Sequence, residues 1–202
     1  MPTTPGATGS RNRRTTNADS DTRRRLIEAT AEVMRTEGYA AATSRRVAAA
    51  AGVKQALVYY YFPTMDDLFV EVMRAGADVA LERMRATLTA EDPLQALWDI
   101  NSESQWTILS TEFTALANHR KAIRAELKAY AERVRDIETA AVTMVLRAHD
   151  IDLERYPPVA ISMLITQTAR SLCNEDAVGV TQGHTELRAF AQRLLAQLDT
   201  ST

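Results

Sequence analysis

The chain has 202 residues, of which 46% are hydrophobic and 25% charged, and its net charge is −2 at neutral pH. This length allows one small and one medium-sized domain, and the longest apolar stretch, near residues 159–169, is too short to span a membrane. The single cysteine, Cys173, excludes an intrachain disulfide. With the absence of a secretory signal sequence, it predicts a cytoplasmic protein. We interpret Cys173 as a small buried apolar residue rather than a redox sensor.

The small net charge hides a division along the chain. Residues 1–64 carry ten Lys and Arg against five Asp and Glu, whereas residues 65–202 carry fourteen against twenty-one. No acidic residue lies between Gly38 and Thr64. A basic end on an acidic body is typical of a protein that presents one face to DNA. A chance variation of surface charge would give the same numbers.

The chain opens on a polar segment. Residues 1–20 are rich in Thr, Pro, Gly, Ser and Asn, with three arginines between positions 11 and 14, which predicts a disordered basic arm. The arm could place arginine in a minor groove of DNA, although a solvated tail has the same composition. A helix is expected over residues 22–37, with Asp21 as N-cap and Gly38 as its end.

The next segment has the layout of a helix-turn-helix, with helices expected at about 44–51 and 55–61. Thr43 is a good N-cap for the first helix. Gly52 can adopt the positive φ that a sharp turn between helices needs, and Ala48 is small enough for the two helices to cross closely. In this motif the second helix lies in the major groove of DNA. An ordinary helical hairpin with glycine in its turn is the alternative.

A longer helix follows. Thr64 and Asp67 have the spacing of a capping box, so we expect this helix to begin at Met65 and to extend into the high eighties. It would connect a DNA-binding domain, residues 21–64, to a helical body, residues 65–202.

Ordered matches over about forty positions carry a family resemblance: Leu26-Ile27-Glu28-Ala29, Gly38-Tyr39, Thr43, Val47-Ala48, Ala51-Gly52-Val53, Tyr59, Tyr61-Phe62-Pro63-Thr64 and Leu68. On these residues, 26–68 resemble the DNA-binding domain of tetracycline-repressor-like regulators, the TetR family. The resemblance implies a dimeric, ligand-responsive DNA-binding regulator, usually a repressor. Two positions depart from the family. Met65 stands where a lysine usually contacts a phosphate, and Tyr61 replaces the commoner histidine.

We expect few base contacts, because the second helix is short. Gln55 can bind adenine with two hydrogen bonds and Ala56 can touch a thymine methyl, whereas hydroxyls and cations suit phosphates. The tyrosines could instead pack on the first helix, as we expect for Phe62. The DNA-binding residues predicted from chemistry and resemblance are Thr43, Arg45, Lys54, Gln55, Ala56, Tyr59, Tyr60 and Tyr61.

The body is expected to be wholly helical, because glycine is absent between Gly76 and Gly179 and helix formers dominate. After the helix from Met65, Pro93 opens the next one, and a break near Asn118 separates two more. The second of these has apolar residues at alternating spacings of three and four over about thirty residues. With helices at about 158–169 and 184–198, the sequence predicts an all-α chain of about nine helices. The apolar seam of the helix of about thirty residues is Ile123, Leu127, Tyr130, Val134, Ile137, Ala141 and Met144.

The last two helices carry more apolar surface than one small domain needs. Residues 159–169 are apolar in nearly every direction, and the final helix has a single apolar face formed by Leu187, Phe190, Leu194 and Leu198. This pattern predicts a two-fold homodimer through the last two helices. Completion of the monomer core is the alternative.

A cavity for a small-molecule effector is expected inside the body. Its lining would be mostly apolar with a few polar contacts, although ordinary core packing is the leading alternative for each of these side chains. His119, with neighbouring arginines, could hold an anionic group or simply be a solvated helix end. The predicted ligand-binding residues are Trp98, Trp106, Phe113, Met144, Met163 and Gln167.

Enzymatic chemistry is not indicated. The three histidines, His119, His149 and His184, are far apart, and no metal-ligand spacing, phosphate-binding loop, dinucleotide motif or nucleophile motif occurs. No metal, cofactor or membrane partner is expected. The sequence therefore predicts a regulator that binds a palindromic double-stranded DNA operator and is released by an effector. A helical ligand-binding or protein-interaction module without DNA binding is the alternative, and Met65 is its main support.

Overall fold

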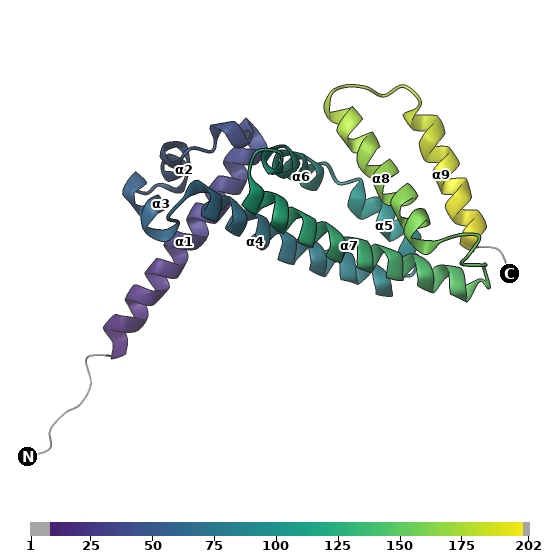
Figure 1. The fold of residues 1–202 in the computed structure, drawn as a ribbon, viewed down its shortest axis with the longest axis horizontal. Coiled ribbons are helices and arrows are strands. Elements are labelled where there is room, and N and C mark those ends of the chain that lie inside the picture. The colour runs from purple at the N-terminus through teal and green to yellow at the C-terminus, as the bar shows by residue number, and fades with distance from the viewer. Residues whose placement is uncertain (1–8, 200–202) are drawn as a thin grey trace, which may run out of the picture. The chain divides into compact units, whose positions relative to one another are not determined.

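The computed structural model describes residues 9–199, and it describes the side chains of residues 19–103 and 108–194. These residues form α-helices and short 3-10 turns without a β-strand, which confirms the all-α prediction (Figure 1). The chain divides into two compact units, Met1–Val72 and Met73–Thr202, with the boundary inside one helix. The described helices are α1 (Gly9–Glu37), α2 (Ser44–Ala51), α3 (Gln55–Tyr61), α4 (Met65–Ala86), α5 (Pro93–Asn101), α6 (Ser104–Ala117), α7 (Lys121–Ala148), α8 (Pro158–Ala177) and α9 (His184–Asp199).

The first helix begins earlier than predicted. Of the expected disordered arm, residues 1–8 lie outside the described residues, and residues 9–20 belong to α1. Two features of the sequence explain the difference. Residues 10–21 contain neither Gly nor Pro, and Asp21 accepts a hydrogen bond from the Arg24 guanidinium at 2.6 Å within the helix instead of capping it.

The turn between α2 and α3 forms as the glycine position predicts. Gly52 has φ 65° and ψ 38°, and its N–H points to the carbonyl oxygens of Ala48 and Ala49. At the other end of α2, the Thr43 Oγ1 accepts a hydrogen bond from the Arg46 N–H at 3.2 Å. These contacts satisfy backbone groups that helix ends leave open.

The predicted capping box opens α4. The Thr64 N–H donates to an Asp67 carboxylate oxygen at 3.0 Å, and the Asp67 N–H donates to the Thr64 Oγ1 at 3.2 Å.

Side chains from α1, α2 and α3 close a small core in the first unit. Its fully buried members include Leu26, Val47 and Val58.

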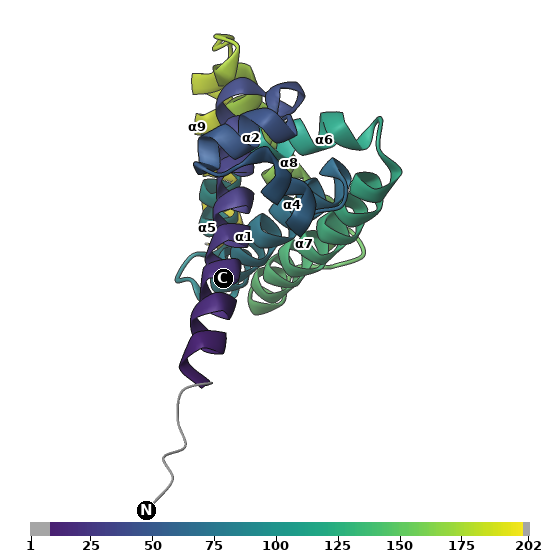
Figure 2. The ribbon, with the colours of Figure 1, turned by 90° about the vertical axis from the view of Figure 1, so that its left-hand side faces the viewer.

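The second unit is organised around α7, the longest helix of that unit. The second half of α4 runs beside α7 in both ribbon views (Figures 1 and 2), and Arg74 on α4 forms an ion pair with Glu126 on α7. α5 and α8 also pack on α7. The buried core of this unit is Leu81, Met84, Leu94, Leu97, Val134, Ala141, Val142, Val145, Leu146 and Ile165.

The predicted seam of α7 is correct except at its end. Ile123, Val134 and Ala141 are buried, but Met144 is exposed. Val145 takes the inward position instead, because α5 and α8 contact α7 on neighbouring faces and widen the buried sector beyond a single stripe. Within the described residues, none of the helices combines the length and apolar composition that a membrane span requires.

A buried histidine joins the last two helices, a role that the sequence pattern did not predict. His184, the first residue of α9, is buried between two carboxylates near the end of α8. Its Nδ1 lies 3.0 Å from Asp176 Oδ1, and its Nε2 lies 2.8 Å from Glu175 Oε2. This arrangement fixes the start of α9 against α8 and so positions the outer faces of both helices.

Candidate functional site

The helix α3 has one buried side and one exposed side. Val58 is fully buried against the core of the first unit, whereas Lys54, Gln55 and Ala56 at its beginning are exposed. Tyr60 is the most exposed tyrosine of this helix, at 70%. A groove of DNA could therefore reach the side chains that sequence chemistry selects for base contacts.

Ser44 orients two of these side chains. The Gln55 Nε2 donates to the Ser44 Oγ at 2.9 Å, and the Tyr59 hydroxyl donates to the same oxygen at 3.1 Å. Gln55 still has one N–H and its carbonyl oxygen available, which is what a two-bond contact with adenine needs. Sequence reasoning missed Ser44, because a serine beside an N-cap residue looks like an ordinary helix start.

The structure distinguishes between two adjacent arginines. Arg46 donates from its Nε to both carboxylate oxygens of Glu37 at 3.1 Å. This hydrogen bond raises the pKa of Arg46 and lowers the pKa of Glu37. Arg45 and Lys54 are exposed, and among the described side chains neither has an acidic partner. Their charges are therefore available for phosphates, as predicted from their type.

Tyr61 is placed differently from the other predicted contacts. Its hydroxyl donates to the Asp19 Oδ1 on α1 at 2.9 Å. Desolvation, together with this hydrogen bond, raises the pKa of Tyr61. The ring of Tyr60 meets that of Tyr61 edge to face, with centroids 4.9 Å apart. A phosphate contact by Tyr61 would require the hydroxyl to leave Asp19, so Thr43 and Tyr60 are the more accessible hydroxyls.

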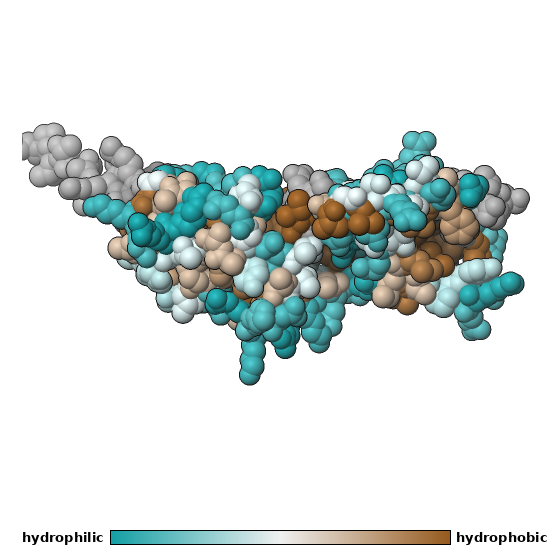
Figure 3. Space-filling model, turned by 90° about the horizontal axis from the view of Figure 1, so that it is seen from above, coloured by the Kyte–Doolittle hydropathy of each residue, from teal (hydrophilic) through white to brown (hydrophobic). Residues whose placement is uncertain are grey.

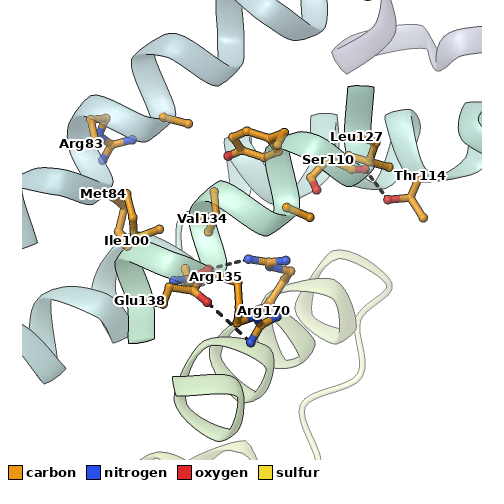
Figure 4. Close-up of a pocket in the computed structure, with 14 residues that line it drawn as sticks. Arg83, Met84, Ile100, Ser110, Thr114, Leu127, Val134, Arg135, Glu138 and Arg170 are labelled. Atoms are coloured by element: carbon orange, nitrogen blue, oxygen red, sulfur yellow. Dashed lines mark hydrogen bonds and ion pairs between the residues drawn. The ribbon is translucent and has the colours of Figure 1, made fainter. Parts of the chain in front are cut away.

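The second unit contains a cavity of about 240 Å³ (Figure 4). Helices α4, α5, α6, α7 and α8 each contribute to its wall. The wall combines apolar side chains with three arginines, one glutamate and one tyrosine. The lining residues are Ala80, Arg83, Met84, Ile100, Asn101, Ser110, Thr114, Leu127, Tyr130, Ala131, Val134, Arg135, Glu138 and Arg170.

Glu138 is the most buried charged residue of this wall, with 1% of its surface exposed. Its Oε2 accepts a hydrogen bond from the Thr166 hydroxyl at 3.4 Å and lies 3.6 Å from the Arg135 Nη1. Burial raises the pKa of Glu138, although Arg135 and Arg170 oppose this shift. Among the described residues, Glu138 Oε1 and Arg135 Nη1 have no hydrogen-bond partner.

Arg170 is held from the opposite side. Its Nη2 donates to the Asn101 Oδ1 at 2.7 Å, and the Asn101 side chain donates in turn to the Leu97 carbonyl at 2.9 Å. Arg83 forms an ion pair with Glu103. Two of the three arginines are therefore fixed by neighbours, while Arg135 retains an unsatisfied donor.

The five predicted ligand-binding residues whose side chains the structure describes do not line this cavity. Phe113 is buried, Trp98 packs against the core, and three others are exposed: Met144, Met163 and Gln167. The side chain of Trp106 lies outside the described residues. Helical periodicity selects large apolar side chains, whereas this cavity forms where charged side chains and alanines leave space. The ligand contacts of the predicted residues remain a prediction.

A substitution at Glu138 tests its electrostatic environment. Because the folded-state pKa of Glu138 lies above the ordinary value near 4.5, its stabilising contribution is complete below that pH and is lost as the pH rises through the folded-state pKa. The free energy of unfolding should therefore fall less between pH 5 and pH 8 in Glu138→Gln than in the wild type. Chemical denaturation at each pH measures this difference. Glu132→Gln, an exposed change on the same helix, should keep the wild-type pH dependence. An unchanged slope in Glu138→Gln would contradict the assignment.

Comparisons with known proteins address both units. Residues 26–72 match the family described as bacterial regulatory proteins, tetR family. No curated protein was found to match the sequence.

Similar solved structures include a TetR transcription regulator from Haloarcula marismortui, with 19% identity over 91% of this chain and 98% of that chain and a TM-score of 0.69. FadR from Bacillus subtilis, in complex with stearoyl-CoA, has 18% identity over 88% of this chain and 98% of that chain, with a TM-score of 0.61. FadR from Bacillus halodurans has 16% identity over 89% and 95%, with a TM-score of 0.66. At these identities the structural likeness shows the fold.

Proposed function

We propose that this chain, whose residues 26–72 match the family of bacterial regulatory proteins, tetR family, is a ligand-responsive repressor of the operator it binds. It recognises a near-palindromic DNA site as a homodimer, and a small effector releases it. Two symmetric copies of α3 would enter the major groove at half-sites about one helical turn apart.

The observation that carries the proposal is the exposed beginning of α3. Gln55 and Tyr59 share Ser44 as a hydrogen-bond acceptor, so both side chains are oriented before DNA arrives. Arg45 and Lys54 supply exposed positive charge beside them. The combination of fixed base-reading groups and available cations suits a DNA groove better than a protein partner.

A mobility-shift assay on the duplex upstream of the chain's own gene tests this function. A retarded complex at low salt, competed by the same duplex but not by unrelated DNA, would support it. No complex with any duplex at low salt would favour the alternative, a helical ligand-binding or protein-interaction module.

The base-reading role is tested at Gln55. Gln55→Ala should relax the preferred sequence at one position of each half-site and weaken binding by about 1–3 kcal/mol per lost contact. Binding selection on a randomised duplex measures both. Arg45→Ala is the matched control, because loss of a phosphate contact should weaken all sequences alike and reduce the salt slope by about one. An unchanged sequence preference in Gln55→Ala would remove this role.

Dimerisation is proposed through α8 and α9. Their exposed apolar side chains are Val159, Met163, Leu164, Leu187, Phe190 and Leu194, and apolar surface interrupts the polar surface in this region of Figure 3. In an isolated chain this surface would face water, which is unfavourable. A two-fold axis would cover it with the same surface of a second copy.

The effector is proposed to act through α4. This helix begins in the first unit and continues into the second, where Arg83 and Met84 line the cavity. A ligand that binds one arrangement of α4 more tightly would lower DNA affinity by the difference between its affinities for the two states.

A further inference from the structure

We propose that the cavity of the second unit binds a small organic monocarboxylate, with Arg135 and Glu138 as the two side chains that hold its carboxylate. This inference rests on the proposed function, because it names the chemical class of the effector. It depends on the volume of the cavity, its charge and its two unsatisfied polar atoms.

The volume limits the size of the ligand. Sites for drug-sized ligands are about 300–1,000 Å³, and the cavity here is about 240 Å³. At about 30 Å³ for each water-sized atom, it holds about eight non-hydrogen atoms. Benzoate and hexanoate are close to this size. Stearoyl-CoA, the ligand of Bacillus subtilis FadR, is far larger.

The charge of the wall favours an anion. The titratable groups that line the cavity are Arg83, Arg135, Arg170, Tyr130 and Glu138. Three cations thus face one carboxyl group. Glu103, outside the lining, pairs with Arg83, and a positive excess remains. An ammonium ligand would be repelled by this excess of positive charge.

The unsatisfied atoms indicate where the carboxylate would sit. Arg135 Nη1, although it lies 3.6 Å from Glu138 Oε2, is a buried donor without a hydrogen-bond partner among the described residues. Glu138 Oε1 is a buried oxygen that also has no hydrogen-bond partner there. Buried polar atoms of this kind are uncommon in native proteins, and a ligand is one explanation. Both residues lie one helical turn apart on α7, beside the cavity (Figure 4). When Glu138 carries a proton, its O–H and the Arg135 N–H present two donors to the two oxygens of a ligand carboxylate.

This geometry predicts uptake of one proton by Glu138 when the ligand binds. Burial acts in the same direction, because it raises the pKa of Glu138 and so favours the protonated form. Affinity should therefore fall as the pH rises above that pKa. Burial also raises the pKa of Tyr130, so this phenol keeps its proton over the same neutral range.

The test measures binding to the full-length protein in the absence of DNA. Isothermal titration calorimetry with benzoate and hexanoate should show one site per chain, at least tenfold tighter at pH 6 than at pH 8. Benzamide and benzylamine, which keep the ring without the carboxylate, should bind at least tenfold more weakly than benzoate. Binding of stearoyl-CoA with no binding of either acid, equal binding of benzamide or benzylamine, or no binding by any probe would overturn the proposal.

Single substitutions identify the side chains that contact the ligand carboxylate. Arg135→Gln should lose at least tenfold in benzoate affinity. Glu138→Gln keeps a neutral donor and should bind benzoate well at both pH values, so it remains informative if Arg135→Gln folds poorly. Arg133→Gln removes a charge from the exposed side of the same helix and should bind as the wild type does. Equal loss in Arg133→Gln and Arg135→Gln would contradict a specific contact.

A mobility-shift assay with benzoate then separates the two proposals. If the acid binds the protein but leaves the protein–DNA complex intact, the inference about the cavity holds and the proposed release of DNA fails. If DNA never binds but the acid does, the chain is a ligand-binding module.

Discussion

Leu164→Glu is expected to convert the protein to a monomer and to weaken binding to a palindromic operator by more than about 100-fold. Leu164 is the most exposed apolar residue of α8, at 66%, and lies beside Met163 in the proposed interface. A two-fold interface repeats each substitution, so two carboxylates would enter one apolar contact. Each would lose its hydration without a partner, at a cost of several kcal/mol. A loss of 100-fold corresponds to about 2.8 kcal/mol.

Sedimentation equilibrium and mobility shifts measure the two effects separately. Val79→Glu is the matched control, because Val79 is an exposed aliphatic residue on α4 outside the proposed interface. It should remain dimeric and bind DNA normally. A dimer that persists in Leu164→Glu would place the interface on another surface.

The beginnings and ends of most helices follow from local chemistry that the sequence displays. Gly52 ends α2 because it takes a left-handed conformation, and Pro93 opens α5 at a position where its missing N–H is not needed. Thr64 and Asp67 satisfy the first turn of α4. Such signals act over three or four residues, so they can be recognised without knowledge of the fold. The start of α1 is the exception, because no local signal in its polar first turns marks the residue at which the helix begins.

The candidate sites depend on contacts that no local pattern announces. Ser44 orients Gln55 and Tyr59 only because the turn at Gly52 brings α2 and α3 together. The predicted DNA face is nevertheless accessible. Because Val58 turns one side of the short helix α3 toward the core, the opposite side must be exposed. The cavity is different, because Arg135 and Glu138 look like ordinary charges on a solvated helix face. The packing of neighbouring helices, α8 among them, against α7 buries Glu138 and the Arg135 Nη1.

Two neighbouring aromatic residues after Val58 should have opposite roles, one in the core and one on the DNA-binding surface. Phe62 is fully buried, and Arg23 lies over its ring at 5.2 Å from the centroid. Phe62→Ala should lower the stability of the first unit by about 3–5 kcal/mol, since it removes a buried ring and leaves a cavity. Amide hydrogen exchange of α2 and α3 in the full-length protein reports the opening free energy of this unit.

Tyr60→Ala is the matched control, because it removes a ring of similar size from an exposed position two residues away. Its stability should change by less than about 0.5 kcal/mol. Its DNA affinity should fall equally for all sequences, because the hydroxyl is expected to contact a phosphate. Phe62→Ala should instead lose affinity and stability together, and conditions that restore its folding should restore its sequence preference. If Tyr60→Ala destabilised the helices as strongly as Phe62→Ala, the exposed aromatic face would be structural rather than a surface for DNA.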